Sequence, residues 1–230
     1  MSSVDMDRPG ALVRSWSTNA EAWTRVVREG GIESRRLVTD AVIVDAVVRL
    51  QPARVLDVGC GEGWLARALA ENRIRVTGVD VSPELIDDAR REGGGDFHAA
   101  SYAEVAADPT RFGREFDAVI CNFSLLDDDP AALLAALRTT LARGGSLVIQ
   151  TVHPWAAMGD EGYVDGWRTE TFASFGGEFA APMPWFFRTI ESWMDVIAGA
   201  GYRLARLIEA IHPSTGRPAS LLIIAEPAVA

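Results

Sequence analysis

Three glycines and one aspartate have the types and the spacing of a nucleotide-binding turn. Gly59, Gly61 and Gly63 lie between an apolar run of strand length and a helical pattern. Because glycine has no Cβ, the chain can turn tightly there and a ligand can approach the backbone. Asp80 ends the next apolar run, 21 residues after Gly59, where a carboxylate can accept hydrogen bonds from both hydroxyls of a ribose. Together these residues favour a nucleotide-type ligand over a merely structural turn.

The glycine spacing also separates two kinds of cofactor. The pattern is G-x-G-x-G, and the third glycine of the dinucleotide fingerprint would fall on Trp64. A tryptophan is too bulky there for close packing of helix on strand or for the approach of a pyrophosphate. The pattern therefore disfavours NAD, although an NAD(P)-dependent oxidoreductase stays open as an alternative.

The same residues resemble a known family. LDVGCGEG at 56–63, followed by VDVS at 79–82, resembles the first two motifs of class I S-adenosylmethionine-dependent methyltransferases, in particular the bacterial small-molecule group. The resemblance extends from about Ser34 to Val152. It implies S-adenosyl-L-methionine as cofactor, S-adenosyl-L-homocysteine as product, and a small, aromatic or heterocyclic metabolite as methyl acceptor. A module that binds the cofactor without transferring the methyl group is a further alternative.

The resemblance also implies which residues meet the cofactor. Asp57 and the backbone of Gly59, Cys60 and Gly61 would hold the methionine part. Asp80 would bind the ribose hydroxyls. The adenine would lie against the residue that follows, Val81.

One position departs from the family. Where an acidic residue often binds the adenine amino group, this chain has Ser101 and Tyr102, so adenine contact falls to Ser101, to the backbone or to stacking by Tyr102. Asn122 and Phe123, after the fourth predicted strand, would flank the methyl-donating end. Trp23, in the N-terminal segment, is a candidate for the carboxylate end of the cofactor.

Arg36 is the second candidate for that carboxylate, and a solvated helix face is the competing interpretation of both residues. Cys60 comes shortly after the first predicted strand and Cys121 ends the fourth, and these two strands are neighbours in the implied sheet. We therefore expect two reduced thiols close together at the rim of the cofactor site.

Aromatic residues are concentrated in one segment that shows no clean helix or strand period. Residues 153–188 hold nine of the 19 aromatics, namely Trp155, Tyr163, Trp167, Phe172, Phe175, Phe179, Trp185, Phe186 and Phe187. Such a segment, just beyond the C-terminal edge of a sheet, can roof a ligand crevice. It can equally pack onto the domain or against a second subunit. Candidate substrate contacts are Trp155, Trp167, Trp185 and Arg188, with Arg168 as a second arginine for an acidic acceptor.

His153 directly follows the fifth predicted strand, at the edge where open α/β sheets bind ligands. It is the candidate general base or acceptor-orienting group, and a structural histidine is the alternative. His, Cys, Asp and Glu nowhere have the spacing of metal ligands, so we expect no metal.

Strand-length apolar runs alternate with helical patterns, which predicts βαβ units. The fold class is therefore α/β, a Rossmann-like class I methyltransferase fold with a seven-stranded, mostly parallel sheet and helices on both faces. The predicted strands are 53–58, 75–80, 96–99, 116–121, 146–152, 202–208 and 219–225. The predicted helices are 19–28, 34–50, 62–71, one from Pro83, 131–143 and 190–200, and the first 18 or so residues are expected to be mobile.

In this division, residues 1–33 form an N-terminal cap, residues 34–230 the methyltransferase domain, and residues 153–188 a lid inserted after the fifth strand.

The amino-acid composition excludes some catalytic chemistries and disfavours some classes of binding partner. All 22 basic residues are arginine, against 32 acidic residues, for a net charge of -10. Without lysine there is no Schiff base and no P-loop lysine, and the acidic balance disfavours nucleic acid. No apolar stretch approaches the ~18 residues of a membrane span. We therefore expect a cytoplasmic protein, monomer or homodimer, that acts on a small molecule.

Overall fold

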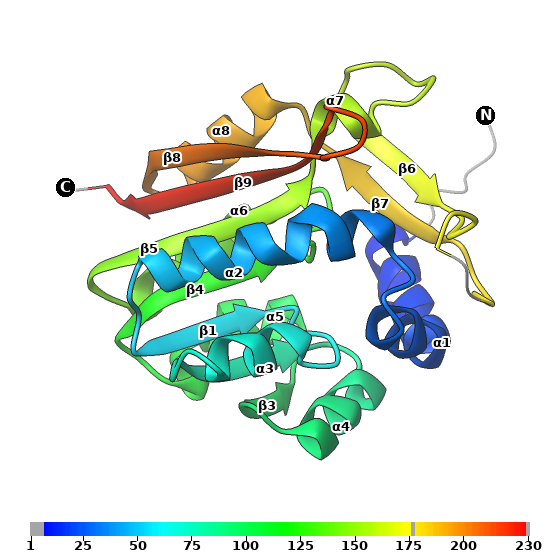
Figure 1. The fold of residues 1–230 in the computed structure, drawn as a ribbon. Coiled ribbons are helices and arrows are strands. Elements are labelled where there is room, and N and C mark those ends of the chain that lie inside the picture. The colour runs from blue at the N-terminus through cyan, green and yellow to red at the C-terminus, as the bar shows by residue number, and fades with distance from the viewer. Residues whose placement is uncertain (1–6, 176–177, 229–230) are drawn as a thin grey trace.

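The fold is built on one seven-stranded sheet, described in a computed structural model for residues 7–175 and 178–228 (Figure 1). The strand order is β3-β2-β1-β4-β5-β9-β8. The first five strands in this order are mutually parallel, and β9 runs antiparallel to both of its neighbours. The strands are β1 (Arg54–Val58), β2 (Arg75–Asp80), β3 (Asp96–Ala99), β4 (Phe116–Asn122), β5 (Leu141–Val152), β8 (Tyr202–Ile211) and β9 (Pro218–Pro227). The predicted fold class is confirmed.

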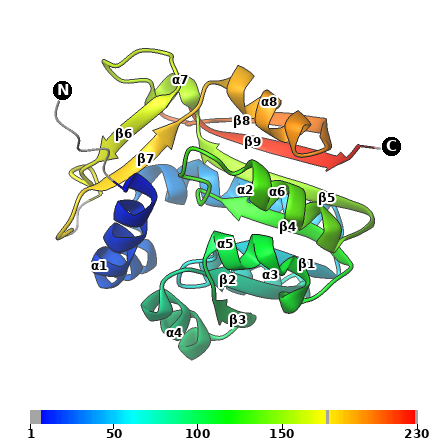
Figure 2. The same cartoon turned by 180° about the vertical axis from the view of Figure 1, so that it is seen from behind.

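Helices cover both faces of the sheet. One face carries α2 (Asp40–Arg49), α3 (Trp64–Ala70) and α4 (Pro83–Glu92), and the other carries α5 (Tyr102–Ala107), α6 (Ala131–Leu137) and α8 (Ile190–Gly199) (Figures 1 and 2). Successive residues of a strand point to opposite faces. Val55 accordingly joins the apolar cluster under α2 and α3, and Leu56 joins the cluster under α5, α6 and α8.

A second, smaller layer lies beyond the C-terminal ends of the parallel strands. It consists of α1 (Arg8–Arg28) and a two-stranded antiparallel sheet of β6 (Gly166–Glu170) and β7 (Met183–Phe187), with the short α7 (Pro154–Ala157) at its start (Figure 1). We call α1 and residues 154–188 together the cap. Its interior is an apolar cluster of Leu12, Trp16, Leu126, Phe172, Phe175, Phe179, Met183 and Trp185.

Local sequence signals explain where several helices begin. The Ser82 hydroxyl accepts a hydrogen bond from the Leu85 amide at 3.3 Å, and Pro83 is the first residue of α4, as predicted. Ser101 and Glu104 form a reciprocal capping box at the start of α5, a helix that is absent from those predicted from the sequence. A 3-10 turn, Pro109–Phe112, follows it.

Several predicted elements have different bounds, or a different helix type, in the structure. The first helix begins at Arg8 instead of residue 19, because Asp7 caps it and its Leu12 and Trp16 pack into the apolar cluster inside the cap. The predicted helix 131–143 ends as α6 and the 3-10 turn Arg138–Thr140, and β5 starts already at Leu141, which pairs with Phe116 across an irregularity in register. Residues 35–39 form a π-helix within the predicted helix 34–50.

Candidate active site

The glycine turn brings the ends of three strands together. Gly59 has φ +80°, and its amide donates to the Val79 carbonyl at 2.7 Å. A Cβ at Gly59 would lie 2.3 Å from the Cβ of Ser124, in the loop after β4. The Ser124 hydroxyl in turn donates to the Val58 carbonyl at 2.7 Å. Only glycine therefore lets the loop after β4 close against the turn after β1.

Asp80 is held at the end of β2 with both carboxylate oxygens facing this turn. Its Oδ2 accepts from the Gly61 amide and its Oδ1 from the Ser82 amide, each at 2.9 Å. Burial raises the pKa of Asp80, and the hydrogen bonds from these amides oppose that rise. Each oxygen keeps acceptor capacity, so the carboxylate can still receive the two hydroxyls of a ribose.

Asp57 lies beneath the same turn and is 1% exposed. Burial, and next the charge of Asp80, raise the pKa of Asp57 to about 7. Its Oδ1 has no hydrogen-bond partner among the described residues. A buried carboxylate oxygen without a partner is costly to the fold, and an ammonium or another donor of a ligand would satisfy it.

The end of β4 carries a strained residue. Phe123 has φ +54°, a conformation that is uncommon without glycine, and its amide donates to the Gln150 carbonyl at 2.7 Å. Asn122, directly before it, has a buried Oδ1 without a partner in the described chain. Strain and unsatisfied polar groups concentrate at functional sites, so both residues stay candidates for the methyl-donating end.

The candidate adenine contacts are partly engaged by the protein itself. The Tyr102 hydroxyl donates to the Ser124 carbonyl at 2.7 Å, and burial raises the pKa of this phenol well above its usual value. The Ser101 hydroxyl donates to Glu104 Oε2 at 2.8 Å within the capping box. Val81 is half-buried beside the turn. Of these residues, Val81 keeps an apolar side chain with no competing polar partner.

Unsatisfied buried atoms gather at this one edge of the molecule. Within residues 7–175 and 178–228, seven buried side-chain N or O atoms have no hydrogen-bond partner. All belong to residues at the C-terminal ends of the parallel strands, in the loops that follow them, at the end of the π-helix, or directly after β7. They are Thr39 Oγ1, Asp57 Oδ1, Glu62 Oε1, Asn122 Oδ1, Asp127 Oδ1, Gln150 Oε1 and Arg188 Nη1.

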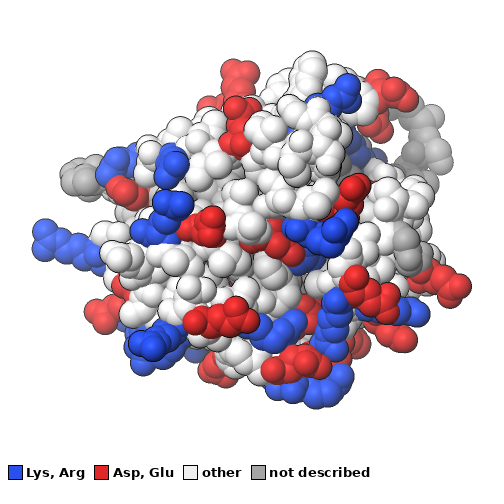
Figure 3. Space-filling view, in the orientation of Figure 1, with Lys and Arg blue, Asp and Glu red and all other residues white. Residues whose placement is uncertain are grey.

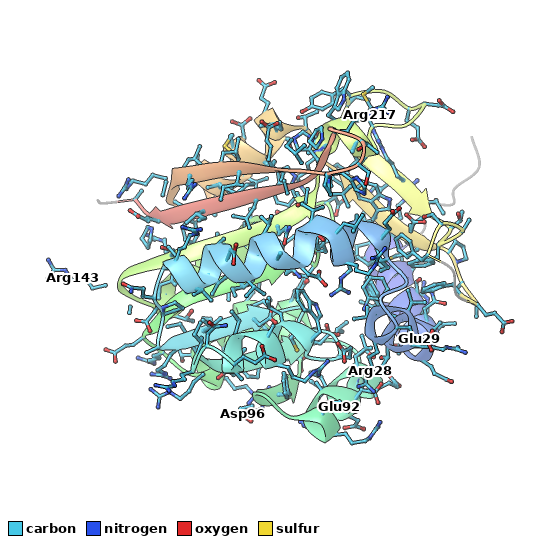
Figure 4. The ribbon with its side chains drawn as sticks, in the orientation of Figure 1. Arg28, Glu29, Glu92, Asp96, Arg143 and Arg217 are labelled. Carbon is cyan, nitrogen blue, oxygen red and sulfur yellow. The ribbon has the colours of Figure 1, made fainter. Side chains whose placement is uncertain are left out.

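The N-terminal helix is attached to the glycine turn by ion pairs. The buried Glu62 carboxylate, inside the turn, lies 3.2 Å from Arg28 Nε of α1 and 2.6 Å from Arg67 Nη2 of α3. Arg28 Nη1 also pairs with Glu92 at 3.2 Å, and Figure 4 shows these two side chains meeting between α1 and α4. Thr24 donates to Asp88 of α4 at 3.1 Å. Helix α1 thus closes one side of the cofactor turn.

Asn19 joins α1 to the hairpin and was missed from the sequence. It is 1% exposed; its Nδ2 donates to the Ala181 carbonyl at 2.7 Å and its Oδ1 accepts from the Ala180 amide at 2.9 Å. An asparagine within a helix is the only signal in the sequence, and nothing there indicates the partner 162 positions away.

The N-terminal candidates take up two different environments. Trp23 is half-buried in the cap, edge-on to Trp16 with ring centroids 5.1 Å apart. Arg36 is exposed at the start of the π-helix. Its neighbour Arg35 pairs with Asp40 at 3.0 Å and covers the Trp64 ring at 4.6 Å.

Three of the four substrate candidates lie on or directly after the hairpin, but the pairing of Trp167 with Phe186 and of Arg168 with Trp185 puts Trp167 and Trp185 on opposite faces of it. Trp167 lies edge-on to Phe186, and Trp185 joins the cap cluster. Arg188 is 3% exposed and its Nη2 donates to the Asp127 carbonyl at 2.7 Å. Trp155, in contrast, is 59% exposed on α7.

The environment of Arg188 is acidic. Burial lowers its pKa, whereas Asp127, Asp165, Asp128 and Asp129 act in the opposite direction. The other arginine of the hairpin, Arg168, is buried and donates to backbone carbonyls, including Gly162 at 2.7 Å.

His153 has protein partners on both ring nitrogens. Its Nδ1 accepts from the Trp155 amide at 3.2 Å, so the neutral ring carries its proton on Nε2, which lies 2.9 Å from Glu209 Oε1. The residue is 2% exposed and caps α7. This geometry suits an orienting group more directly than a base that is free to accept a proton.

The expectation of neighbouring thiols was wrong. Cys60 and Cys121 are both reduced and buried. Cys60 belongs to the apolar cluster under α2 and α3, and Cys121 to the cluster on the opposite face of the sheet. The turn after β1 redirects the chain, which the strand order alone does not reveal.

No group of three or more His, Cys, Asp or Glu residues within 7–175 and 178–228 is placed to hold a metal ion. In the same part of the chain, no helix has both the length and the apolar character that crossing a bilayer requires. Acidic and basic side chains are interspersed over the face drawn in Figure 3.

Comparison with known proteins agrees with this geometry. Residues 55–145 match the family described as "Methyltransferase domain". "Ubiquinone biosynthesis O-methyltransferase" from Xanthomonas oryzae pv. oryzae is 38% identical over 117 residues, which cover 48% of this chain and 47% of that protein. The protein of the same name from Xylella fastidiosa is 39% identical over 113 residues, covering 46% and 44%. The chain spans about half the length of these curated relatives.

Solved structures share the fold over more of the chain. A putative S-adenosylmethionine-dependent methyltransferase from Listeria monocytogenes superimposes with a TM-score of 0.65 at 19% identity, covering 83% of this chain and 100% of that one. Magnesium protoporphyrin IX methyltransferase from Synechocystis PCC 6803, solved with bound S-adenosylhomocysteine, gives 0.65 at 18% identity, covering 96% and 100%. The resemblance to class I methyltransferases seen in the sequence is confirmed in domain match and in fold.

Proposed function

We propose that this chain is an S-adenosyl-L-methionine-dependent methyltransferase that acts on a small molecule. The observation that carries the proposal is the set formed by the glycine turn, Asp80 and the unpartnered Asp57, all at the C-terminal ends of β1 and β2. Open α/β sheets bind ligands at that edge. Asp57 Oδ1 lacks a donor and Asp80 has spare acceptor capacity, which fits the ammonium and the ribose hydroxyls of this cofactor.

Each part of the cofactor has proposed partners. Asp57 and the backbone of Gly59, Cys60 and Gly61 hold the methionine part, and Asp80 holds the ribose. Val81, with Ser101 and Tyr102 nearby, borders the adenine.

At the methyl end, the proposed neighbours are Asn122 and Phe123. Arg36, exposed at the start of the π-helix, is the proposed partner of the cofactor carboxylate, and Trp23 covers that end from α1.

The protein's contribution to the reaction is positioning. When bound, the cofactor supplies a methyl group on a positively charged sulfur. The chain's residues hold the acceptor in line with that methyl group and exclude water, which can supply several orders of magnitude in rate. As its bond to the methyl group forms and the bond from the methyl group to sulfur breaks, an O–H or N–H acceptor passes its proton to solvent water. We propose that His153, fixed by Glu209, orients the acceptor side of the site.

The cap suits an aromatic or heterocyclic acceptor. We propose that residues 1–33 and 153–188 act as one lid, because Asn19 and the cap cluster join them. Trp167, Trp185 and Arg188 are its proposed substrate contacts, with Trp155 at the outer rim. The matched relatives are O-methyltransferases by name, so hydroxyl acceptors are the first to test.

Partners and location are part of the same proposal. The excess of acidic residues, 32 against 22 basic, argues for a protein that does not bind nucleic acid. We propose a cytoplasmic location and a monomer or homodimer.

Methyl transfer tests the proposal directly. Purified protein is incubated with S-adenosylmethionine labelled in its methyl group and a panel of phenols, catechols and heterocyclic amines, and labelled products are identified by mass spectrometry. Thermal melting with S-adenosylhomocysteine and with NAD(H) is measured in parallel. We expect protection by S-adenosylhomocysteine only, and transfer to at least one acceptor. Protection by NAD(H) alone would replace the proposal with an oxidoreductase; protection by S-adenosylhomocysteine without transfer to any acceptor would favour a binding module.

A further inference from the structure

Gln150 is a buried amide whose orientation is fixed by the fold. It is 1% exposed on β5, and its Nε2 donates to the Thr39 carbonyl at 3.1 Å and to the Ser220 hydroxyl at 2.8 Å. A carbonyl can only accept, so the atom facing Thr39 must be the nitrogen. The amide oxygen therefore points elsewhere, and no described residue donates to it.

A second unpartnered oxygen belongs to the residue that receives this bond. Thr39 is 2% exposed and its Oγ1 also has no partner in the described chain. Thr39 ends the π-helix Arg35–Thr39. Such a widened turn costs helix stability and frequently marks a functional site. Here its last carbonyl is available to hold the Gln150 side chain.

The pair lies one strand away from the proposed methyl-donating end. Gln150 of β5 is in register with Asn122 of β4, so their side chains point to the same face at a strand spacing of about 4.8 Å. The Oδ1 of Asn122 is the third unpartnered oxygen in this row. The next residue, Phe123, is bound through its amide to the Gln150 carbonyl.

These three groups share one chemical property. Six of the seven unpartnered atoms at this edge are oxygens, and the single nitrogen, on Arg188, lies on the cap among acidic residues. Among the described residues, the unpartnered atoms next to the proposed methyl-donating end can therefore accept hydrogen bonds, and none of them carries a positive charge. A substrate carboxylate or ether would leave Gln150 Oε1 unsatisfied, whereas an O–H or N–H group would satisfy it.

We infer that Thr39, Gln150 and Asn122 form the subsite that selects the methyl acceptor, and that it takes an acceptor with O–H or N–H donors beside the methylated atom. The inference rests on the proposed function, since it names the acceptor class of that same site. A vicinal diol or diamine on an aromatic ring has this chemistry, because one group can receive the methyl while its neighbour donates to Gln150.

Three matched ring compounds test the acceptor class. Catechol presents two O–H groups, ortho-phenylenediamine two N–H₂ groups, and 1,2-dimethoxybenzene the same ring without donors. Binding of each to the protein saturated with S-adenosylhomocysteine is measured by ligand-observed NMR. We expect catechol or the diamine to bind at least tenfold more tightly than 1,2-dimethoxybenzene, and the tighter of the two identifies O–H or N–H as the preferred donor. Equal binding of the three, or no binding of either donor compound, would overturn the inference.

The variant Thr39→Val tests whether this subsite causes the preference for compounds with O–H or N–H donors. The change removes a hydroxyl that has no protein partner and keeps the carbonyl that holds Gln150, so the melting temperature should stay the same or rise. Affinity for the preferred donor compound should fall about 3- to 10-fold, as expected for one neutral hydrogen bond, and affinity for 1,2-dimethoxybenzene should not change. Unchanged affinity for the donor compound would remove Thr39 and overturn the subsite.

Thr140→Val is the matched control. Thr140 is fully buried at the opposite edge of the sheet, and its hydroxyl donates to the Leu137 carbonyl at 2.8 Å. This variant should melt at a lower temperature with its ligand affinities unchanged. Binding of S-adenosylhomocysteine to the wild-type protein distinguishes failure of the proposed function from failure of the subsite. If the wild type does not bind it, the proposed function is wrong. If the wild type binds it but does not prefer donor compounds, only the subsite is wrong.

Discussion

The polar side chains at the two edges of the sheet differ in whether other protein groups satisfy their hydrogen bonds. At the N-terminal edge, Asp117 Oδ2 accepts from the Ala53 and Arg54 amides, Thr140 donates to Leu137, and the Tyr202 hydroxyl donates to the Leu134 carbonyl at 3.0 Å. At the C-terminal edge lie all seven unpartnered atoms of the described chain. A buried polar group with a purely structural role normally has a hydrogen-bond partner within the protein. The contrast indicates that the C-terminal edge is completed by ligands.

The largest expected difference between the edges concerns two glycines with nearly the same positive φ. Gly59 has φ +80° and Gly144 φ +81°, but a Cβ meets Ser124 at 2.3 Å at Gly59 and no described atom within 4 Å at Gly144. Gly144→Ala should cost about 1 kcal/mol of unfolding free energy through left-handed strain alone. Gly59→Ala should cost about 3 kcal/mol or more, because Ser124 must also move. Urea denaturation measures both, and equal losses would mean that the turn and the loop after β4 are not tightly packed.

Two carboxylates give the next comparison. Asp80 and Asp117 each accept two backbone amide hydrogen bonds, at opposite edges. Replacing either by alanine should lower the unfolding free energy by about 1–3 kcal/mol. Only Asp80→Ala should also weaken S-adenosylhomocysteine binding, by about 1–3 kcal/mol in calorimetry. Equal affinities of the two variants for this ligand would take Asp80 out of the cofactor site.

Asp57, at the C-terminal edge, should make the stability of the protein depend on pH. Its pKa is raised to about 7 in the fold from an ordinary value of 3.8, so between these values the folded protein keeps a proton that the unfolded chain has lost. Protonation of Asp57 therefore adds to the free energy of unfolding. This contribution is complete below about pH 4 and is lost as the pH rises to about 7. Asp57→Asn should reduce this slope to the part that remains from Asp80, whose pKa burial also raises. Melting temperatures of the ligand-free proteins between pH 4 and 8 measure it, and parallel curves for the two proteins would show that Asp57 does not titrate there.

Cofactor binding should have the opposite pH dependence. A ligand ammonium favours the charged form of Asp57, so S-adenosylhomocysteine affinity should rise by up to about tenfold per pH unit below 7 and level off above it. In Asp57→Asn the affinity should be lower at pH 8 and vary less with pH. A wild-type affinity independent of pH between 5.5 and 8 would contradict contact between this carboxylate and the cofactor's ammonium.

The smallest expected effect compares the two ends of α1. Arg28 bridges Glu62 of the turn and Glu92 of α4, whereas Arg14 pairs with Asp7 where both side chains are 68% exposed. Arg28→Gln should speed the release of S-adenosylhomocysteine a few-fold, in line with about 0.5–1 kcal/mol for a partly exposed pair. Arg14→Gln should leave release unchanged. Stopped-flow displacement resolves the two, and identical rates would mean that α1 does not help to close the site.

The central sheet and the cofactor turn could be predicted from the sequence because their signals are local. An apolar run, a glycine turn and a carboxylate at the end of the next strand are fixed by neighbours within about 25 positions. Helix α5 was missed although its capping box, Ser101 with Glu104, is also local. Its six residues are too few to establish a helical period.

The sequence indicated a cap at residues 1–33 and a lid at 153–188, but the structure of the cap could not be predicted, because its determinants join distant parts of the chain. Helix α1 has a polar sequence, and its buried face is defined by distant partners, namely the hairpin that Asn19 binds and helix α4, to which Thr24 donates. The hairpin strands β6 and β7 are five residues each and separated by 12 residues, without a tight-turn signal. The role of Gln150 likewise depends on the π-helix that holds it.

Mapping S-adenosylhomocysteine onto the protein by amide NMR tests the central claim most directly. The isotope-labelled protein is titrated and the shift of each backbone amide is followed. The account predicts the largest shifts at 57–63, 80–82 and 122–127, and little change around Ala53, Asp117 and Thr140 at the opposite edge. Saturation of the protein with no shifts at the C-terminal edge, or with shifts confined to the N-terminal edge, would contradict it.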